Sequence, residues 1–210
     1  MTDPVDWPPV SVVMPVLNEE RHLATSVEHV LAQNYPGQVE LLMAVGPSKD
    51  ATCAVADRLA AADPRIRVVD NPTGRTPAGL NLAIAEASHD IVVRVDAHGE
   101  LTPGYIRTAV ETLLRTGAAN VGGLMDARGT TPFERAVAAA YNSPLGLGGN
   151  AFHLAQTPEG PAESVFLGVF RKDALVALGG FDETLHRAQD WDLNHRLRTA
   201  GETVWFNPAL

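Results

Sequence analysis

Cysteine is almost absent from this 210-residue sequence, in which Cys53 is the only one. A single cysteine cannot form an internal disulfide, so a hydrophobic core must hold the fold together, and a chain of this length can bury one. Cys53 falls in an expected helix without an evident histidine partner, so we interpret it as a packing residue. The scarcity of cysteine fits a reducing compartment.

Positive charge is also scarce. The chain has 16 Lys and Arg against 25 Asp and Glu, which gives a formal net charge of -9. We expect no nucleic-acid partner, because phosphate backbones require a basic surface. An acidic protein that binds a diphosphate needs a local cation, and a divalent metal ion is the usual one.

Long apolar runs are missing as well. No stretch reaches the roughly 18 apolar residues that a membrane helix requires, and residues 1–9 do not have the pattern of a signal peptide. We therefore expect a cytoplasmic protein. The sequence stops just after a strand-like segment at 202–206, so a longer natural chain, with a segment beyond Leu210 at the inner face of the membrane, is left open.

Several catalytic signatures do not occur. The sequence has no Walker motif, no Gly-x-Ser-x-Gly elbow and no His-Glu-x-x-His. The first expected strand runs into residues 15–19 (PVLNE) without the glycine-rich turn of a dinucleotide-binding domain, which counts against a dehydrogenase. This segment could instead lay its backbone along a nucleoside.

Apolar β-branched runs alternate with helical patterns in the first half of the chain. Strands are expected at 10–16, 39–45, 66–69 and 91–95, and helices at 19–33, 49–62 and after the Thr-Pro pairs at 76–77 and 102–103. This alternation predicts an α/β fold with a mostly parallel central sheet flanked by helices. The segments after Val16, Val45 and Val95 should then converge on one crevice.

The second half is less regular. We expect a strand at 119–125, a helix at 133–141, a long loop at 142–163, a strand at 164–170, and helices at 172–178 and 188–199.

Asp96 and His98 follow a buried strand directly and are the strongest chemical signal. In an extended backbone, residues two apart point to the same side, so both can face one metal ion. The competing interpretation is a turn in which Asp96 caps the next element. We favour function for both residues. His186 could be a third ligand, although an ordinary loop histidine is the better interpretation.

Asp190 opens the last expected helix, on the same face as Leu193 and Leu197. Its carboxylate should lean towards the protein body, where a general base belongs. Asp192 instead fits a structural role, because it can pair with Arg196 one turn on. Arg75 and Arg94 are weaker candidates for diphosphate contacts. We interpret Ser48 as the cap of the helix that follows it.

Four motifs together resemble family 2 glycosyltransferases of the GT-A fold, over roughly residues 10–207. They lie at residues 12–20 (VVMPVLNEE), 94–98 (RVDAH), 179–183 (GGFDE) and 189–194 (QDWDLN). The RVDAH form is similar to bacterial exopolysaccharide glucosyltransferases of the succinoglycan type.

The resemblance implies inverting transfer from a nucleotide-diphospho-sugar (a UDP- or GDP-sugar) to a glycan, a lipid-linked glycan or a small glycoside, in cell-envelope polysaccharide biosynthesis. It implies a Rossmann-like fold with an extension at 1–9, a nucleotide-sugar-binding half at 10–125 and an acceptor-binding half at 126–210. A Mn²⁺ or Mg²⁺ ion would bind Asp96 and His98, and Asp190 would be the base. The expected donor-side residues are Pro15, Val16, Leu17, Glu19, Val45, Arg75, Arg94 and Asp96, and the acceptor-side residues are Gly168, Gln189 and Trp191.

Three positions depart from the family pattern. Val45 stands where an aspartate usually reads the uracil, so the base of the donor is left open. Gln189 replaces the glutamate before the catalytic aspartate. The Gln-x-x-Arg-Trp motif of processive synthases is absent, which favours transfer of a single sugar.

Two alternatives would also bind a sugar nucleotide. A nucleotidyltransferase that makes sugar nucleotides would need a glycine-rich phosphate loop and a lysine after the first strand, and both are missing. A non-catalytic nucleotide-sugar binder that kept the fold stays open.

Overall fold

The computed structural model describes residues 7–143, 152 and 156–210. Within these residues an eight-stranded sheet has the order β3-β2-β1-β4-β7-β5-β8-β6. The elements are β1 (Val10–Val16), α1 (Leu23–Leu31), β2 (Val39–Val45), α2 (Thr52–Ala62), β3 (Ile66–Asp70), α3 (Thr76–Glu86), β4 (Ile91–Arg94), α4 (Tyr105–Thr116), β5 (Asn120–Gly123), α5 (Pro132–Tyr141), β6 (Gly160–Pro161), β7 (Phe166–Arg171), α6 (Lys172–Ala177), α7 (Gln189–Thr199) and β8 (Val204–Phe206).

The first four strands pair parallel in the order β3-β2-β1-β4. β1 lies between β2 and β4, with Val10 opposite Val39 on one side and Ile91 on the other. Such strands are covered on both faces, which explains their continuous apolar sequences. The predicted α/β class with a mostly parallel sheet is confirmed.

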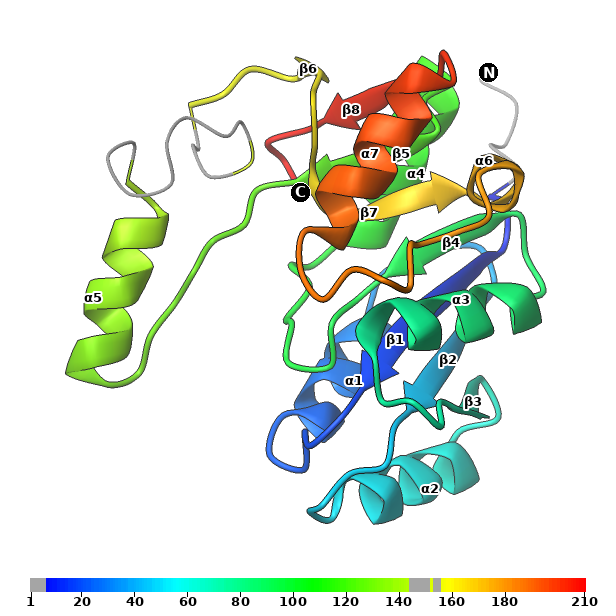
Figure 1. The fold of residues 1–210 in the computed structure, drawn as a ribbon, viewed down its shortest axis with the longest axis vertical. Coiled ribbons are helices and arrows are strands. Elements are labelled where there is room, and N and C mark those ends of the chain that lie inside the picture. Colours follow the sequence, from blue (N-terminus) through cyan, green and yellow to red (C-terminus); the bar gives the residue numbers. More distant parts are fainter. Residues whose placement is uncertain (1–6, 144–151, 153–155) are drawn as a thin grey trace.

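Helices cover both faces of the sheet (Figure 1). Val12 and Met14 of β1 belong to the core that includes residues of α1, α2 and α4. Val13, between them, belongs to the second core, with residues of α3, α6 and α7. The alternation along one strand therefore places one helical layer on each side of the sheet.

The sequence predicts the strand β7 but not its direction. It pairs antiparallel with both β4 and β5, and the ladder with β5 shifts register between Val121 and Gly123. Leu167 and Gly168 in β7 have φ angles of 55° and 125°. A Cβ on Gly168 would lie 2.4 Å from Asn120 Oδ1, so close packing inside the sheet accounts for this glycine.

Some local expectations are wrong. The Thr-Pro pair at 102–103 precedes α4 instead of opening it, because Gly104 (φ 81°) is the N-cap. Thr76 is already helical, with Arg75 as the N-cap of α3. Cys53 is exposed and is not a packing residue. The inward face of α2 carries Val55 and Leu59, as their spacing predicted, whereas Ala62, also expected to face inward, is exposed.

The connection between β5 and β7 carries α5, which stands apart from the sheet (Figure 1). Phe133 on this helix is 78% exposed. The loop expected at 142–163 lies partly outside the described residues, and its described end contains the two-residue β6, which pairs with β8. Among the described helices, none combines the length and the apolar character needed to cross a membrane.

Candidate active site

The segments after β1, β2 and β3 meet at the carboxyl ends of these strands. Gly46 donates its backbone N–H to the carbonyl of Val16 at 2.8 Å. A Cβ on Gly46 would lie 2.7 Å from the Cα of Gly74 and 3.1 Å from the Leu17 side chain. Glycine at position 46 therefore permits this close approach of two backbones.

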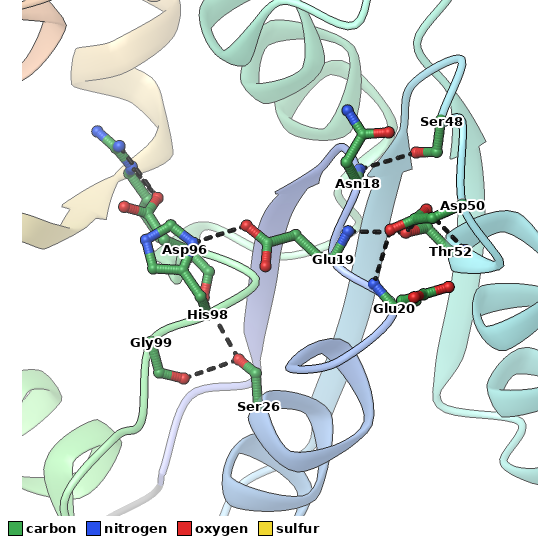
Figure 2. Close-up of polar contacts among 11 residues, drawn as sticks. Asn18, Glu19, Glu20, Ser26, Ser48, Asp50, Thr52, Asp96, His98 and Gly99 are labelled. Atoms are coloured by element: carbon green, nitrogen blue, oxygen red, sulfur yellow. Dashed lines mark hydrogen bonds and ion pairs between the residues drawn. The ribbon is translucent and has the colours of Figure 1, made fainter. Parts of the chain in front are cut away.

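Side chain to main chain hydrogen bonds join the loop after β1 to the loop after β2 (Figure 2). The backbone N–H of Asn18, which has a φ of 56°, donates to Ser48 Oγ at 3.0 Å, and Lys49 N–H donates to Asn18 Oδ1 at 2.8 Å. Glu19 N–H donates to Thr52 Oγ1 at 2.7 Å. Ser48 thus holds the β1 loop and is not the cap of α2, whose N-cap is Ala51.

Asp96 lies in a turn rather than in extended backbone. β4 ends at Arg94, and the carbonyl of Asp96 accepts a hydrogen bond from Gly99 N–H at 2.8 Å. Ser26 of α1 supports this turn, because its hydroxyl donates to the Gly99 carbonyl at 2.8 Å. The premise that strand geometry aligns Asp96 with His98 is therefore wrong, and a tight turn keeps the two residues close instead.

His98 faces Glu19 of the loop after β1 (Figure 2). Its Nδ1 lies 2.8 Å from Glu19 Oε1. This contact links the β4 segment to the β1 loop, so the predicted convergence after Val16, Val45 and Val95 is confirmed. A carboxylate on Nδ1 fixes the tautomer that leaves Nε2 free to bind a metal.

The donor set of Asp96 and His98 fits a divalent ion such as Mn²⁺, because it offers a carboxylate oxygen and an imidazole nitrogen. In the part of the chain that the structure describes, no cluster of three or more His, Cys, Asp or Glu residues could hold a metal ion. Further ligands would have to come from a bound diphosphate or from water.

Asp190 lies near Asp96, because both acids pair with the side chain of Arg94. Leu193 and Leu197 of α7 are fully buried, which turns the Asp190 face of the helix inward as predicted. Arg94 forms ion pairs with both acids: its Nη2 lies 3.1 Å from Asp96 Oδ1, and its Nη1 pairs with Asp190 Oδ1. One guanidinium therefore joins the two acids that the sequence singled out.

The environment of Asp190 changes its ionisation. Burial raises the pKa of its carboxyl to about 6. Arg94 opposes this rise and the charge of Asp96 adds to it. The two carboxylates in turn hold the pKa of the Arg94 guanidinium above its ordinary value, although burial acts in the other direction. Asp190 is thus more basic than an ordinary aspartate, because low polarity disfavours its charge.

The other acid of this motif has a different role. Asp192 pairs with Arg196 at 2.7 Å along the helix, as predicted. Gln189 is the first residue of α7, after Ala188, an N-cap with a left-handed φ of 61°. The Trp191 ring packs against Phe152, with centroids 6.3 Å apart, and is 38% exposed. It therefore presents an aromatic surface beside Asp190.

Two nitrogen atoms of the Arg75 guanidinium have no hydrogen-bond partner in the part of the chain that the structure describes. These two atoms, Nε and Nη2, are buried. The charge of Arg75 is one of the smaller causes that lower the pKa of Asp182, whose main cause is the hydrogen bond from Thr184. A buried donor group without a partner is costly, so Arg75 is available for an anion.

Sequence patterns did not reveal several contacts of the site. Ser26 and Thr52 sit within helices and carried no motif, and the bridging role of Arg94 depends on a residue 96 positions away. Phe181, whose ring centroid is 5.7 Å from Arg94 Cζ, belonged to a recognised motif but had no assigned role. The signal that the sequence offered for this bridge was a charged residue, Arg94, at the end of an apolar strand.

Comparison with solved structures places this architecture in the GT-A class of glycosyltransferase folds. The mannosyltransferase PcManGT from Pyrobaculum calidifontis, in complex with GDP-Man and Mn²⁺, aligns with a TM-score of 0.74 over 98% of this chain and 56% of that chain, at 21% identity. TarS 1–349 of S. aureus, in complex with UDP, aligns with a TM-score of 0.67 over 95% of this chain and 60% of that chain, at 14% identity.

Sequence comparison gives the family. The profile described as Glycosyl transferase family 2 matches residues 11–177, and the chain therefore belongs to this family. It is 37% identical to the succinoglycan biosynthesis protein ExoA of Rhizobium meliloti (strain 1021) over 196 residues, which is 92% of this chain and 59% of that protein. This chain thus spans about three fifths of that relative. The family resemblance drawn from the four motifs is confirmed.

Proposed function

We propose that this chain is an inverting glycosyltransferase that moves a sugar from a nucleotide-diphospho-sugar to an acceptor hydroxyl, with Asp190 as the general base. The observation that carries the proposal is the convergence of Asp96 and Asp190 on Arg94. An acid at the end of the parallel strands and an acid on α7 are thereby held by one guanidinium.

The ionisation of Asp190 suits a base. With a pKa of about 6, its carboxylate is charged at neutral pH but accepts a proton more readily than an ordinary aspartate does. It would take the proton of the acceptor hydroxyl as that oxygen attacks the anomeric carbon. Trp191 and Gln189 flank it and would contact the acceptor, as we expected from the sequence. We also keep the expectation that Gly168 lies towards the acceptor.

The donor would bind where the β1, β2 and β3 segments meet. Leu17, at 39% exposure, and the backbone of residues 15–19 would lie along the nucleoside, beside Val45. The unpaired Arg75 atoms would contact the diphosphate. Asp96 and His98 would hold a Mn²⁺ or Mg²⁺ ion, with Glu19 orienting His98. Bound there, the ion neutralises charge that develops on the leaving diphosphate.

The relatives support this choice of donor and pathway. The solved structures contain GDP-Man with Mn²⁺ in one case and UDP in another. We therefore propose a UDP- or GDP-sugar as donor. The name of the Rhizobium relative supports a role in polysaccharide biosynthesis, and we propose a glycan or lipid-linked acceptor at the inner face of the membrane. Residues 10–125 would bind the donor and residues 126–210 the acceptor.

The base assignment is tested with Asp190→Asn. We expect sugar transfer to fall at least about 100-fold, because general-base catalysis contributes on this scale, while calorimetry shows nucleotide-diphosphate binding within about threefold of wild type. Asp192→Asn is the matched control and should retain transfer. In the wild type, kcat should rise with pH and level off above about 6. Unchanged transfer by Asp190→Asn would refute the assignment, and no transfer from any donor by the wild type would favour the non-catalytic binder.

Metal use is tested by calorimetry of UDP and GDP with and without Mn²⁺. We expect Mn²⁺ to tighten binding by about tenfold or more, because it neutralises the diphosphate, and Asp96→Asn to remove this gain. The exposed Asp126 provides the control variant Asp126→Asn. Equal affinity with and without Mn²⁺ and Mg²⁺ counts against metal assistance.

A further inference from the structure

Arg94 is bound by groups from three separate segments. Its side chain is 6% exposed. Nε and Nη2 lie 3.3 and 3.1 Å from Asp96 Oδ1, and Nη1 is paired with Asp190. The Phe181 ring faces the guanidinium from the segment after α6. The side chain therefore joins the proposed donor site to the helix that carries the proposed base.

The charges around Arg94 explain why a cation is needed between the two acids. Two carboxylates that are each only about one fifth exposed (23% for Asp96 and 22% for Asp190) repel each other strongly. One guanidinium reduces the summed charge of the group from -2 to -1. Without it, the two carboxylates would move apart, and this movement would displace the proposed base.

The shape of the guanidinium matters as well as its charge. Arginine presents several N–H donors in a fixed plane and packs on aromatic rings, whereas lysine offers one compact charge. Only a planar fork reaches Asp96 with Nε and Nη2 and Asp190 with Nη1 at the same time. Lysine would keep the charge but would lose part of this geometry.

We propose that Arg94 is a positioning residue with two effects. Its guanidinium holds the Asp190 carboxylate beside the donor site, and its charge opposes cation binding at Asp96 until a negative diphosphate is present. The inference rests on the proposed function, in which Asp190 is the base and Asp96 a cation ligand. It assigns Arg94 a role different from the diphosphate contact expected from the sequence.

Kinetics test the positioning effect. Arg94→Gln should lower kcat about 100-fold, a typical result of misplacing a reacting group, and should leave the donor KM within about threefold. Arg94→Lys, which keeps the charge, should recover at least about tenfold of that loss. A raised donor KM with unchanged kcat would support the earlier interpretation of Arg94 as a diphosphate contact and would overturn the proposal. Equal losses of kcat in Arg94→Gln and Arg94→Lys would also overturn it. Thermal unfolding of each variant shows whether it is folded.

Calorimetry with MnCl₂ alone tests the second effect and does not depend on activity. The comparison is Asp190→Asn against the double variant Arg94→Gln/Asp190→Asn. In the double variant both partners of the ion pair are neutral, so no unpaired buried charge destabilises the fold. Removal of Arg94 should tighten Mn²⁺ binding by about tenfold, because a neighbouring like charge is lost. Arg128→Gln/Asp190→Asn, which removes an exposed arginine, is the matched control and should change nothing.

Unchanged or weaker Mn²⁺ binding in the Arg94 double variant overturns the electrostatic part of the proposal. The outcomes separate this inference from the proposed function. If the wild type transfers no sugar, the Mn²⁺ titrations still measure the effect of Arg94. If Arg94→Gln transfers sugar like the wild type, Asp190→Asn still decides whether the chain has the proposed base.

Discussion

The two parts of the sheet fix their site residues by different means. Around β1–β3, main-chain groups dominate: Gly46 bonds to the Val16 carbonyl, and the N–H groups of Asn18 and Glu19 bond to side chains of the next loop. Around β7 and α7, side chains far apart in sequence make the connections, as in the pair between Arg94 and Asp190. Substitutions should therefore act through backbone conformation in the first part and through lost side-chain partners in the second.

A second contrast lies within the later part of the chain. α7 packs Leu193 and Leu197 into the core, whereas α5 exposes Phe133 and borders a cavity of about 310 Å³ with Val137 and Tyr141. Both helices follow the parallel half in sequence, but only α7 is part of a helical layer on the sheet. We expect the stability of the fold to depend on α7 far more than on α5.

The difference in stability between α7 and α5 is tested by shortening one apolar side chain on each helix, and the change on α7 should be the largest effect. Leu193→Ala should lower the free energy of unfolding by about 2–5 kcal/mol, because it empties a fully buried site. Val137→Ala, at a residue 39% exposed, should change it by only about 0.5 kcal/mol. Urea denaturation followed by circular dichroism measures both. Similar losses in the two variants would show that α5 is as strongly packed as α7.

A smaller effect is expected from alanine substitutions that test whether backbone conformation controls the donor site. Gly74 and Gly117 have φ angles of 64° and 68°, but an added Cβ would lie 3.1 Å from Pro47 Cδ at Gly74 and meets no atom within 4 Å at Gly117. Alanine at either position should cost about 1–2 kcal/mol through left-handed strain. Only Gly74→Ala should also weaken UDP or GDP binding in calorimetry, because it pushes the β2 and β3 segments apart. Equal nucleotide affinity in both variants would argue against a backbone-controlled donor site.

The smallest expected effect is a local pH response of α5. Hydrogen bonds from the Thr130 hydroxyl, and from the N–H groups of Thr131 and Thr130, lower the pKa of Glu134 from 4.5 to about 2. A lowered acid pKa stabilises the capped helix end fully above pH 4.5, and this stabilisation is lost as pH falls towards 2. The amide NMR shifts of Thr130 and Thr131 should titrate near pH 2 and lose this step in Glu134→Gln. A midpoint near 4.5 would show that the capping box does not form.

Much of the parallel half could be predicted from sequence, because the information there is local. Apolar runs of seven residues gave β1 and β2 with their observed bounds, and βαβ units leave little choice of topology. The inward face of α7 followed from the spacing of Asp190, Leu193 and Leu197. The antiparallel direction of β7 could not be predicted, since strand patterns carry no direction and the partner strands are distant in sequence.

The sequence by itself determined the family, the order of strands and helices in the parallel half and the acids at positions 96 and 190, because periodicity and short motifs depend only on neighbouring residues. Tertiary structure alone decided that a turn held by Ser26 places Asp96 near His98, that Glu19 orients the imidazole, and that Arg94 lies between the two acids. The physical reason is that burial and charge pairing arise only when segments distant in the chain pack together, and these determine the ionisation of Asp190.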